Sequence, residues 1–175
     1  MKAKQILTDK NHYMTELEIF PALMVSRANT LNIETNVNEN FKGFGVAITG
    51  SSCYNLSIME KNERKELLNK IYSDNGIGLS VGRLSIGSSD YSAEVYSYDD
   101  EPFDVELKHF SIERDKKYII PMIKEILKIK PDLFLFASPW SPPGWMKTGE
   151  NMCGGYMREE FVECLRNAPG SRRFL

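Results

Sequence analysis

The sequence has no long hydrophobic run and no excess of charge of either sign. Nothing in its 175 residues approaches the roughly 20 consecutive apolar residues of a membrane-spanning helix. Residues 1–20 are polar and mixed in charge, without the apolar centre of a secretion signal. The 22 basic and 24 acidic residues give a formal net charge of −2. We therefore expect no membrane span, no nucleic-acid partner and a cytoplasmic location.

Cysteine and cofactor-binding motifs are also scarce. Cys53, Cys153 and Cys164 are odd in number and lack metal-ligand spacing, which is typical of free thiols in a reducing compartment. The glycines of segment 43–50 do not have the G-x-G-x-x-G spacing of dinucleotide sites, and no phosphate-loop sequence occurs. The sequence therefore predicts neither a metal site nor a cofactor.

What the sequence does contain is an alternation of short apolar strands and helices. Its hydrophobic fraction of 42% and charged fraction of 26% fit one globular domain. The pattern predicts strands at 44–49, 77–86 and 133–137, and helices at 57–75, at 119–127 with an end before Pro131, and at about 157–165. Two long loops, 88–111 and 138–155, follow the second and third strands.

Local signals set more detailed expectations. Continuous rather than alternating apolarity predicts strands that are buried on both faces. Residues 51–56 are expected to form a loop, and Ser57 with Glu60 matches a capping box that would start the first helix. Gly76 is expected to end that helix in a left-handed conformation.

Repeated strand–helix units imply parallel strands with right-handed crossovers, as in a doubly wound sheet or an eight-fold barrel. A barrel needs roughly 200 residues or more, so about three of its eight units fit here. The predicted fold class is α/β: the first three βα units of a (β/α)8 TIM barrel, truncated, and preceded by a short strand-bearing N-terminal segment.

Candidate functional residues lie at the strand ends, where barrel enzymes place their sites. Arg83 lies in an apolar strand, where a guanidinium needs compensating partners. It would either keep a catalytic carboxylate ionised or form a structural ion pair with Asp90 or Asp104. Asp90 would accept hydrogen bonds from sugar hydroxyls, or simply stabilise a turn.

Two tryptophans flank the prolines after the third strand. The indoles of Trp140 and Trp145 suit the apolar faces of sugars, although ordinary burial is the favoured interpretation for Trp145. The acidic cluster at 99–104 is interpreted as a solvated loop rather than a metal site.

Several segments together resemble family-30 glycoside hydrolases, the glucosylceramidase-like group, over about residues 31–164. The segments that carry the resemblance are Gly43–Thr49, Gly78–Arg83, Ser88–Ser92, Tyr96–Asp100 and Ala137–Lys147. The chain would be an N-terminal fragment of such an enzyme. Residues 43–165 would form a partial barrel, and residues 1–42 would contribute strands of a β-sandwich.

The resemblance implies hydrolysis of β-glycosidic bonds with retention of configuration, by one acid/base glutamate and one nucleophilic glutamate. In the family these follow strands four and seven, so no catalytic residue is expected in this chain, which would be inactive. Arg83, Asp90 and Trp140 would bind the substrate, a β-glucoside or related carbohydrate. Glucosylceramide, β-1,6-glucan and xylosides remain open as substrates of the parent enzyme.

The sequence departs from the family pattern at three places. Val46 stands where glycine is usual, and Gly50 stands where an acidic residue is usual. Residues 166–175 form an aberrant tail, in which Pro169 and Gly170 break any helix, as a frameshift or gene truncation would produce. Two alternatives to the hydrolase fragment are a non-catalytic sugar-binding protein and a non-functional remnant.

Overall fold

The computed structural model describes residues 4–18 and 40–167, which belong to two units, 1–39 and 40–175. In the first unit, β1 (Gln5–Leu7) pairs antiparallel with β2 (Thr15–Leu17). The Asp9 carboxylate stabilises the turn between them by accepting hydrogen bonds of 2.8 Å from the backbone N–H groups of Asn11 and His12. That residues 1–42 belong to a β-sandwich stays a prediction, and residues 19–39 lie outside the described residues.

The second unit contains a parallel sheet of three strands in the order β3 (Gly45–Ile48), β4 (Val81–Ile86), β5 (Phe134–Pro139). Helices α1 (Gly50–Ile58) and α2 (Lys61–Tyr72) connect β3 to β4. The 3-10 helix η1 (Glu113–Lys116) and α3 (Ile119–Ile129) precede β5. After β5 come the 3-10 helices η2 (Gly144–Met146) and η3 (Glu159–Phe161), then α4 (Val162–Asn167).

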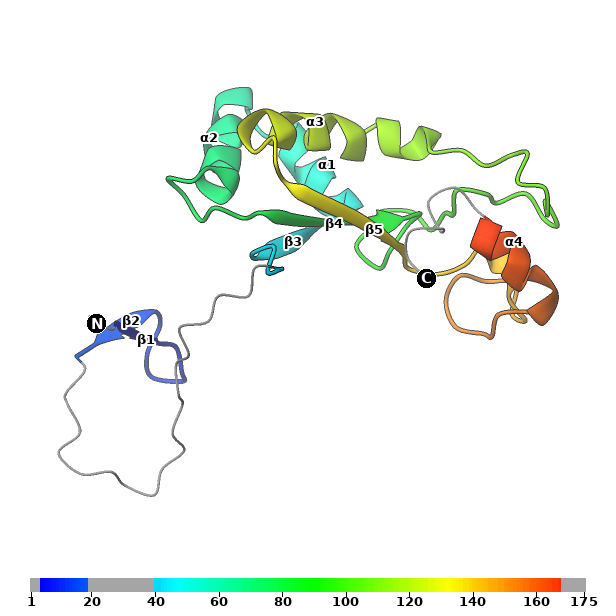
Figure 1. Cartoon of the computed structure of the whole chain (residues 1–175), viewed down its shortest axis with the longest axis horizontal. Helices are drawn as coiled ribbons and strands as arrows, with labels where there is room; N and C mark the ends of the chain where they lie inside the picture. Colours follow the sequence, from blue (N-terminus) through cyan, green and yellow to red (C-terminus); the bar gives the residue numbers. More distant parts are fainter. Residues whose placement is uncertain (1–3, 19–39, 168–175) are drawn as a thin grey trace, which may run out of the picture. The chain divides into compact units, whose positions relative to one another are not determined.

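Helices α1, α2 and α3 lie on one side of this sheet (Figure 1). The apolar stripe predicted for 119–127 is confirmed, because Ile119, Met122 and Ile126 of α3 are buried. They pack in one core with Leu68 of α2 and Ile48 of β3. None of the helices within 4–18 and 40–167 is long and apolar enough to cross a membrane.

The start of the first helix differs from the prediction. Residues 51–56 are helical rather than a loop, since α1 begins directly after β3. Thr49 caps α1 by accepting a hydrogen bond of 3.2 Å from the N–H of Ser52. The capping box at Ser57 is wrong, because Ser57 lies near the end of α1 and Glu60 itself caps α2 through its carboxylate.

The end of α2 also differs. The helix stops at Tyr72, and the left-handed glycine is Gly78, with a φ of 70°, rather than Gly76. Residues 77–80 therefore form a turn and an approach to β4 instead of the first part of the strand. Ile77, at 72% exposed, lies outside the core.

The strands are covered on one face only, which corrects the expectation of burial on both. Three of the four residues of β3 are exposed, and Phe134 of β5 is 48% exposed. Strand alternation places Ala47, Arg83, Phe136 and Ser138 on the same face as Phe134, opposite to the helices. We call this the free face of the sheet.

The loops after β4 and β5 gather with α4 at the carboxyl ends of the strands (Figure 1). There Trp145, Met146 and Phe161 form a second, smaller core. The helix expected at 157–165 is replaced by η3 and α4, which continues to Asn167. The rest of the predicted tail, residues 168–175, lies outside the described part of the chain.

Candidate functional site

Arg83 and Trp140 meet on the free face, at the carboxyl end of the sheet. Arg83 comes from β4, and its Nε donates a 2.8 Å hydrogen bond to Oγ of Ser138 in the register-neighbouring strand β5. Trp140 directly follows β5 and remains 52% exposed. The guanidinium carbon of Arg83 lies 5.7 Å from the centroid of the Trp140 ring. Such a cation–π contact contributes about 0.5–1 kcal/mol at an exposed site.

Arg83 has no carboxylate partner among the described residues, so neither predicted ion pair forms. Asp104 instead accepts a 2.7 Å hydrogen bond from the backbone N–H of His109. The guanidinium is accommodated by the Ser138 hydroxyl and the indole because it lies on the free face and not inside the helix-covered core. Its remaining N–H groups can donate hydrogen bonds to a ligand.

Asp90 lies in the turn that follows β4, and its side chain is exposed. The turn is closed by a 3.1 Å hydrogen bond from the N–H of Ser89 to Oγ of Ser92. No hydrogen bond or ion pair joins Asp90 to another residue in the described ranges. The structure thus brings Arg83 and Trp140 into contact, and the exposed Asp90 carboxylate is bonded to neither of them.

A buried carboxylate that sequence analysis missed anchors the loop after β4. Asp115 of η1 is 6% exposed and accepts hydrogen bonds from the hydroxyls of Tyr96, at 2.7 Å, and Tyr98. Burial, followed by the hydrogen bond to Asp115, raises the pKa of both phenols. The Tyr-x-Tyr spacing, which places both side chains on one face of an extended segment, was the available signal.

The acidic cluster at 99–104 is not simply a solvated loop. Asp99 is 2% exposed, and one of its carboxylate oxygens has no hydrogen-bond partner in the described structure. Burial raises the pKa of this carboxyl group above its ordinary value. The backbone carbonyl of Asp99 accepts a 3.0 Å hydrogen bond from the indole N–H of Trp145. Trp145 is 7% exposed, which confirms its interpretation as an ordinary buried residue.

A buried lysine, also missed from the sequence, fixes the loop after β5. Lys147 is 6% exposed, and its Nζ donates hydrogen bonds to Oγ of Ser141 at 3.1 Å and to the carbonyl of Met152 at 2.8 Å. These bonds close the segment 141–152 on itself. Trp140 directly precedes this closed segment.

The structure has parallel strands joined by helices, with polar and aromatic side chains at the carboxyl ends of the strands. This arrangement defines the α/β class of proteins, whose functional sites lie at the carboxyl ends of the strands. Residues 41–160 match the Glycosyl hydrolase family 30 TIM-barrel domain. The chain belongs to glycosyl hydrolase family 30, and the resemblance read from the sequence is confirmed.

Individual relatives agree with this assignment. The chain is 38% identical to Putative glucosylceramidase 4 of Caenorhabditis elegans over 127 residues, which are 70% of this chain and 24% of that protein. It is 39% identical to the Lysosomal acid glucosylceramidase of Mus musculus over 118 residues, 66% of this chain and 23% of the relative. Among solved structures, the endo-beta1,6-glucanase BT3312 has a TM-score of 0.60 and 38% identity, over 69% of this chain and 28% of the other.

The chain therefore spans about a quarter of the length of the curated relatives it matches. The matched part is the region that contains Arg83, Asp90 and Trp140.

Proposed function

We propose that this chain forms part of the sugar-binding site of a retaining β-glycosidase. In this proposal β3, β4 and β5 are the first three strands of a (β/α)8 barrel, and the free face is turned toward the barrel interior. The observation that carries the proposal is the Arg83–Trp140 pair, an exposed indole beside a guanidinium with uncommitted donors. Such a pair offers an apolar face to sugar C–H groups and hydrogen bonds to sugar hydroxyls.

Each of the three residues has a separate role in this site. Trp140 stacks on the apolar face of the sugar ring, and Arg83 donates hydrogen bonds that orient it. Asp90, whose carboxylate is exposed and unpaired in the described structure, accepts hydrogen bonds from hydroxyls of the same sugar. The substrate class is a β-linked glucoside, supported by relatives that are named glucosylceramidases and β-1,6-glucanases.

The chemical step belongs to two glutamates outside these 175 residues. One protonates the leaving oxygen while the other attacks the anomeric carbon, and water then hydrolyses the glycosyl-enzyme. The chain itself contributes binding and orientation, so we expect it to have no hydrolytic activity. Hydrolysis of an aryl β-glucoside by the purified chain, abolished by Asp90→Asn, would contradict this assignment of roles.

The constructive test is a chimera in which residues 41–160 replace the matching part of an active glucosylceramidase. We expect the chimera to hydrolyse an aryl β-glucoside and Trp140→Ala to reduce kcat/KM by roughly tenfold or more, as loss of an aromatic contact in a desolvated site would. Tyr156→Ala is the matched control, because Tyr156 is 83% exposed and forms no hydrogen bond or ring contact with Arg83 or Trp140 within the described residues. Equal activity of the two variants would refute the assigned role of Trp140.

Sugar binding without catalysis is a second candidate, favoured by the exposure of Trp140 in the chain as it stands. The chain contains two tryptophans, and the other, Trp145, is 7% exposed. A glucoside titration should therefore change the fluorescence of the natural chain and not that of Trp140→Phe. A response that survives in Trp140→Phe would place the ligand elsewhere.

A further inference from the structure

A cavity lies between the start of α1, the loop after β4 and the junction of η1 with α3. Its volume is about 400 Å³, within the roughly 300–1,000 Å³ of small-molecule sites. The side chains that matter for its chemistry are Tyr54, Glu94, Tyr96, Arg114, Lys117 and Tyr118. None of the residues assigned above to the sugar site lines it, so this is a separate place on the domain. We call it the tyrosine cavity.

Aromatic rings give the tyrosine cavity a fixed apolar wall. The rings of Tyr54 and Tyr118 are in edge contact, with centroids 5.3 Å apart and an interplanar angle of 82°. Tyr54 nevertheless remains 45% exposed. A ring that is braced along its edge and open to solvent can stack on the C–H face of a ligand with little loss of side-chain freedom.

Cations stand over two of the rings. The guanidinium carbon of Arg114 is 5.0 Å from the centroid of Tyr96, and Nζ of Lys117 is 5.0 Å from that of Tyr118. Within the described residues, Lys117 forms no ion pair with a carboxylate. Its ammonium donors are therefore available to a ligand in the cavity.

The side chains that line the tyrosine cavity include equal numbers of acidic and basic groups. Glu94 and Glu113 add two carboxylates to the two cations Arg114 and Lys117, and Glu113 also accepts a 2.7 Å hydrogen bond from Nζ of Lys116, which does not line the cavity. Glu94 lies 3.6 Å from the guanidinium of Arg114, close enough for a weak ion pair. Both signs of charge line the wall and each carboxylate has a cationic neighbour, so a neutral ligand with many hydroxyls can use the donors and acceptors alike. Together with the aromatic wall, this chemistry favours a carbohydrate.

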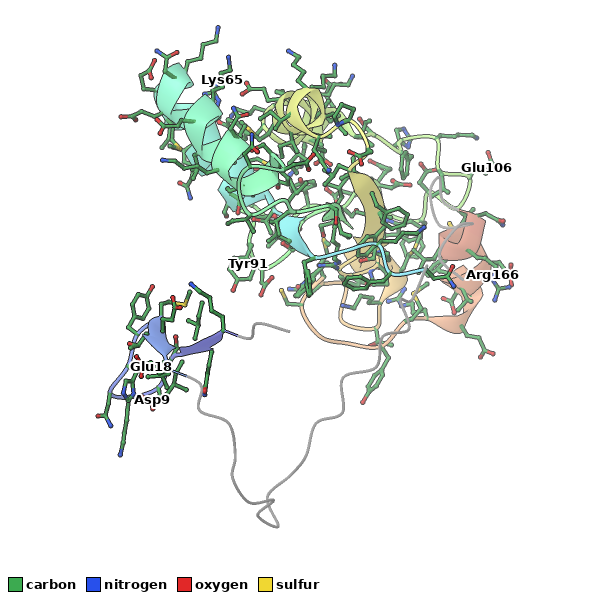
Figure 2. The ribbon with its side chains drawn as sticks, turned by 60° about the vertical axis from the view of Figure 1, so that its left-hand side comes forward. Asp9, Glu18, Lys65, Tyr91, Glu106 and Arg166 are labelled. Carbon is green, nitrogen blue, oxygen red and sulfur yellow. The ribbon has the colours of Figure 1, made fainter. Side chains whose placement is uncertain are left out.

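The tyrosine cavity lies next to the turn that carries Asp90. The backbone N–H of Ser51, in the first turn of α1, donates a 3.0 Å hydrogen bond to the carbonyl of Tyr91. Tyr91 is labelled in Figure 2, and Gly50 and Ser92 on either side of this bond both line the cavity. An added Cβ at Gly50 would lie 3.3 Å from Oγ of Ser92, so any side chain at residue 50 would occupy part of this space.

We propose that the tyrosine cavity is a second carbohydrate-binding site, which holds a neutral saccharide independently of Trp140. The probe is a β-1,6-linked glucose disaccharide, titrated into the full chain at up to about 20 mM while amide NMR shifts are followed. We expect shifts at residues around the cavity, and an affinity about fivefold weaker in Tyr54→Ala, as the loss of one aromatic contact predicts. Tyr156→Ala should bind as the natural chain does.

Trp140→Ala separates this inference from the proposed function. If the cavity binds by itself, the Tyr54-dependent shifts persist in Trp140→Ala even when the sugar site has been lost or never existed. Binding that is sensitive to Trp140→Ala and insensitive to both Tyr54→Ala and Lys117→Ala would overturn the inference. Absence of any shifts at the cavity, or tighter binding of the negatively charged glucuronide analogue, would overturn it as well.

Discussion

Asp115 is the residue whose removal should most disturb the loop between β4 and α3. Its carboxylate accepts both phenolic hydroxyls, from Tyr96 and Tyr98, and the three side chains are largely shielded from water. Asp115→Ala would leave the Tyr96 hydroxyl without an acceptor and the Tyr98 hydroxyl with only the carbonyl of Ser85, 3.4 Å away. Since a hydrogen bond to a charged group contributes about 1.5–3 kcal/mol, two of them give an expected loss of about 3–6 kcal/mol in the free energy of unfolding.

Urea denaturation, followed through the fluorescence of the buried Trp145, measures this loss in the free energy of unfolding. Double-mutant cycles then attribute the loss to the individual hydrogen bonds. Tyr96→Phe and Tyr98→Phe remove one hydroxyl each and keep the ring, so each should couple to Asp115→Ala by about 1–3 kcal/mol. Asp115→Asn should lie between the natural chain and the alanine variant, because an amide offers one oxygen to two donors. A loss below about 1 kcal/mol in Asp115→Ala, or coupling near zero, would refute the anchoring role.

Three further predictions concern stability. Burial, with a smaller effect of the Asp115 charge, raises the pKa of Cys53 from 9.0 to about 12. The folded chain thus retains a proton that the unfolded chain releases, and the free energy of unfolding should fall as pH rises above 9.0, by up to about 1.4 kcal/mol per pH unit. Between pH 9.0 and 10.0 Cys53→Ala should remove this slope in urea melts, whereas above pH 10.0 the raised pKa values of Tyr96 and Tyr98 add a slope of their own. Arg64 forms two hydrogen bonds with Glu125, of 3.0 and 3.1 Å, so Arg64→Lys should lower stability by about 1–3 kcal/mol, and an unchanged denaturation midpoint would contradict the bidentate geometry. Gly45→Ala would place its Cβ 2.0 Å from the carbonyl oxygen of Val81 and should cost about 3 kcal/mol, whereas Gly149→Ala, with nothing within 4 Å, should melt like the natural chain.

The sequence predicted the parts of the fold that depend on strong periodicity. The predicted apolar stripe of α3 was confirmed, because a segment with an apolar residue at every third or fourth position can bury all of them together only as a helix. The boundaries of α1 and α2 were wrong for a local reason. Thr49 and Glu60 both satisfy free backbone donors, and the match of Ser57 to a capping box was a competing signal that the structure does not use.

The site could be predicted only in part. Arg83 and Trp140 were identified from strand ends and from the family resemblance, and the structure brings them together. Asp115 and Lys147 were missed because their roles arise from tertiary contacts: one is defined by two tyrosines 17 and 19 residues away, the other by a loop folded back on itself. No local spacing rule carries such information.

The free face connects the site with the rest of the barrel proposed for this chain. Arg83 shares this face with Phe134 and Phe136, whose rings lie 6.4 Å apart and of which the first is 48% exposed. A cation–π contact worth about 0.5–1 kcal/mol at an exposed site rises to about 2 kcal/mol or more when water is excluded. Segments that cover the free face would therefore strengthen the Arg83–Trp140 contact at the same time as they bury the phenylalanines. Sugar affinity and the covering of the sheet are thus expected to be coupled, so the chimera should bind β-glucosides more tightly than the chain alone.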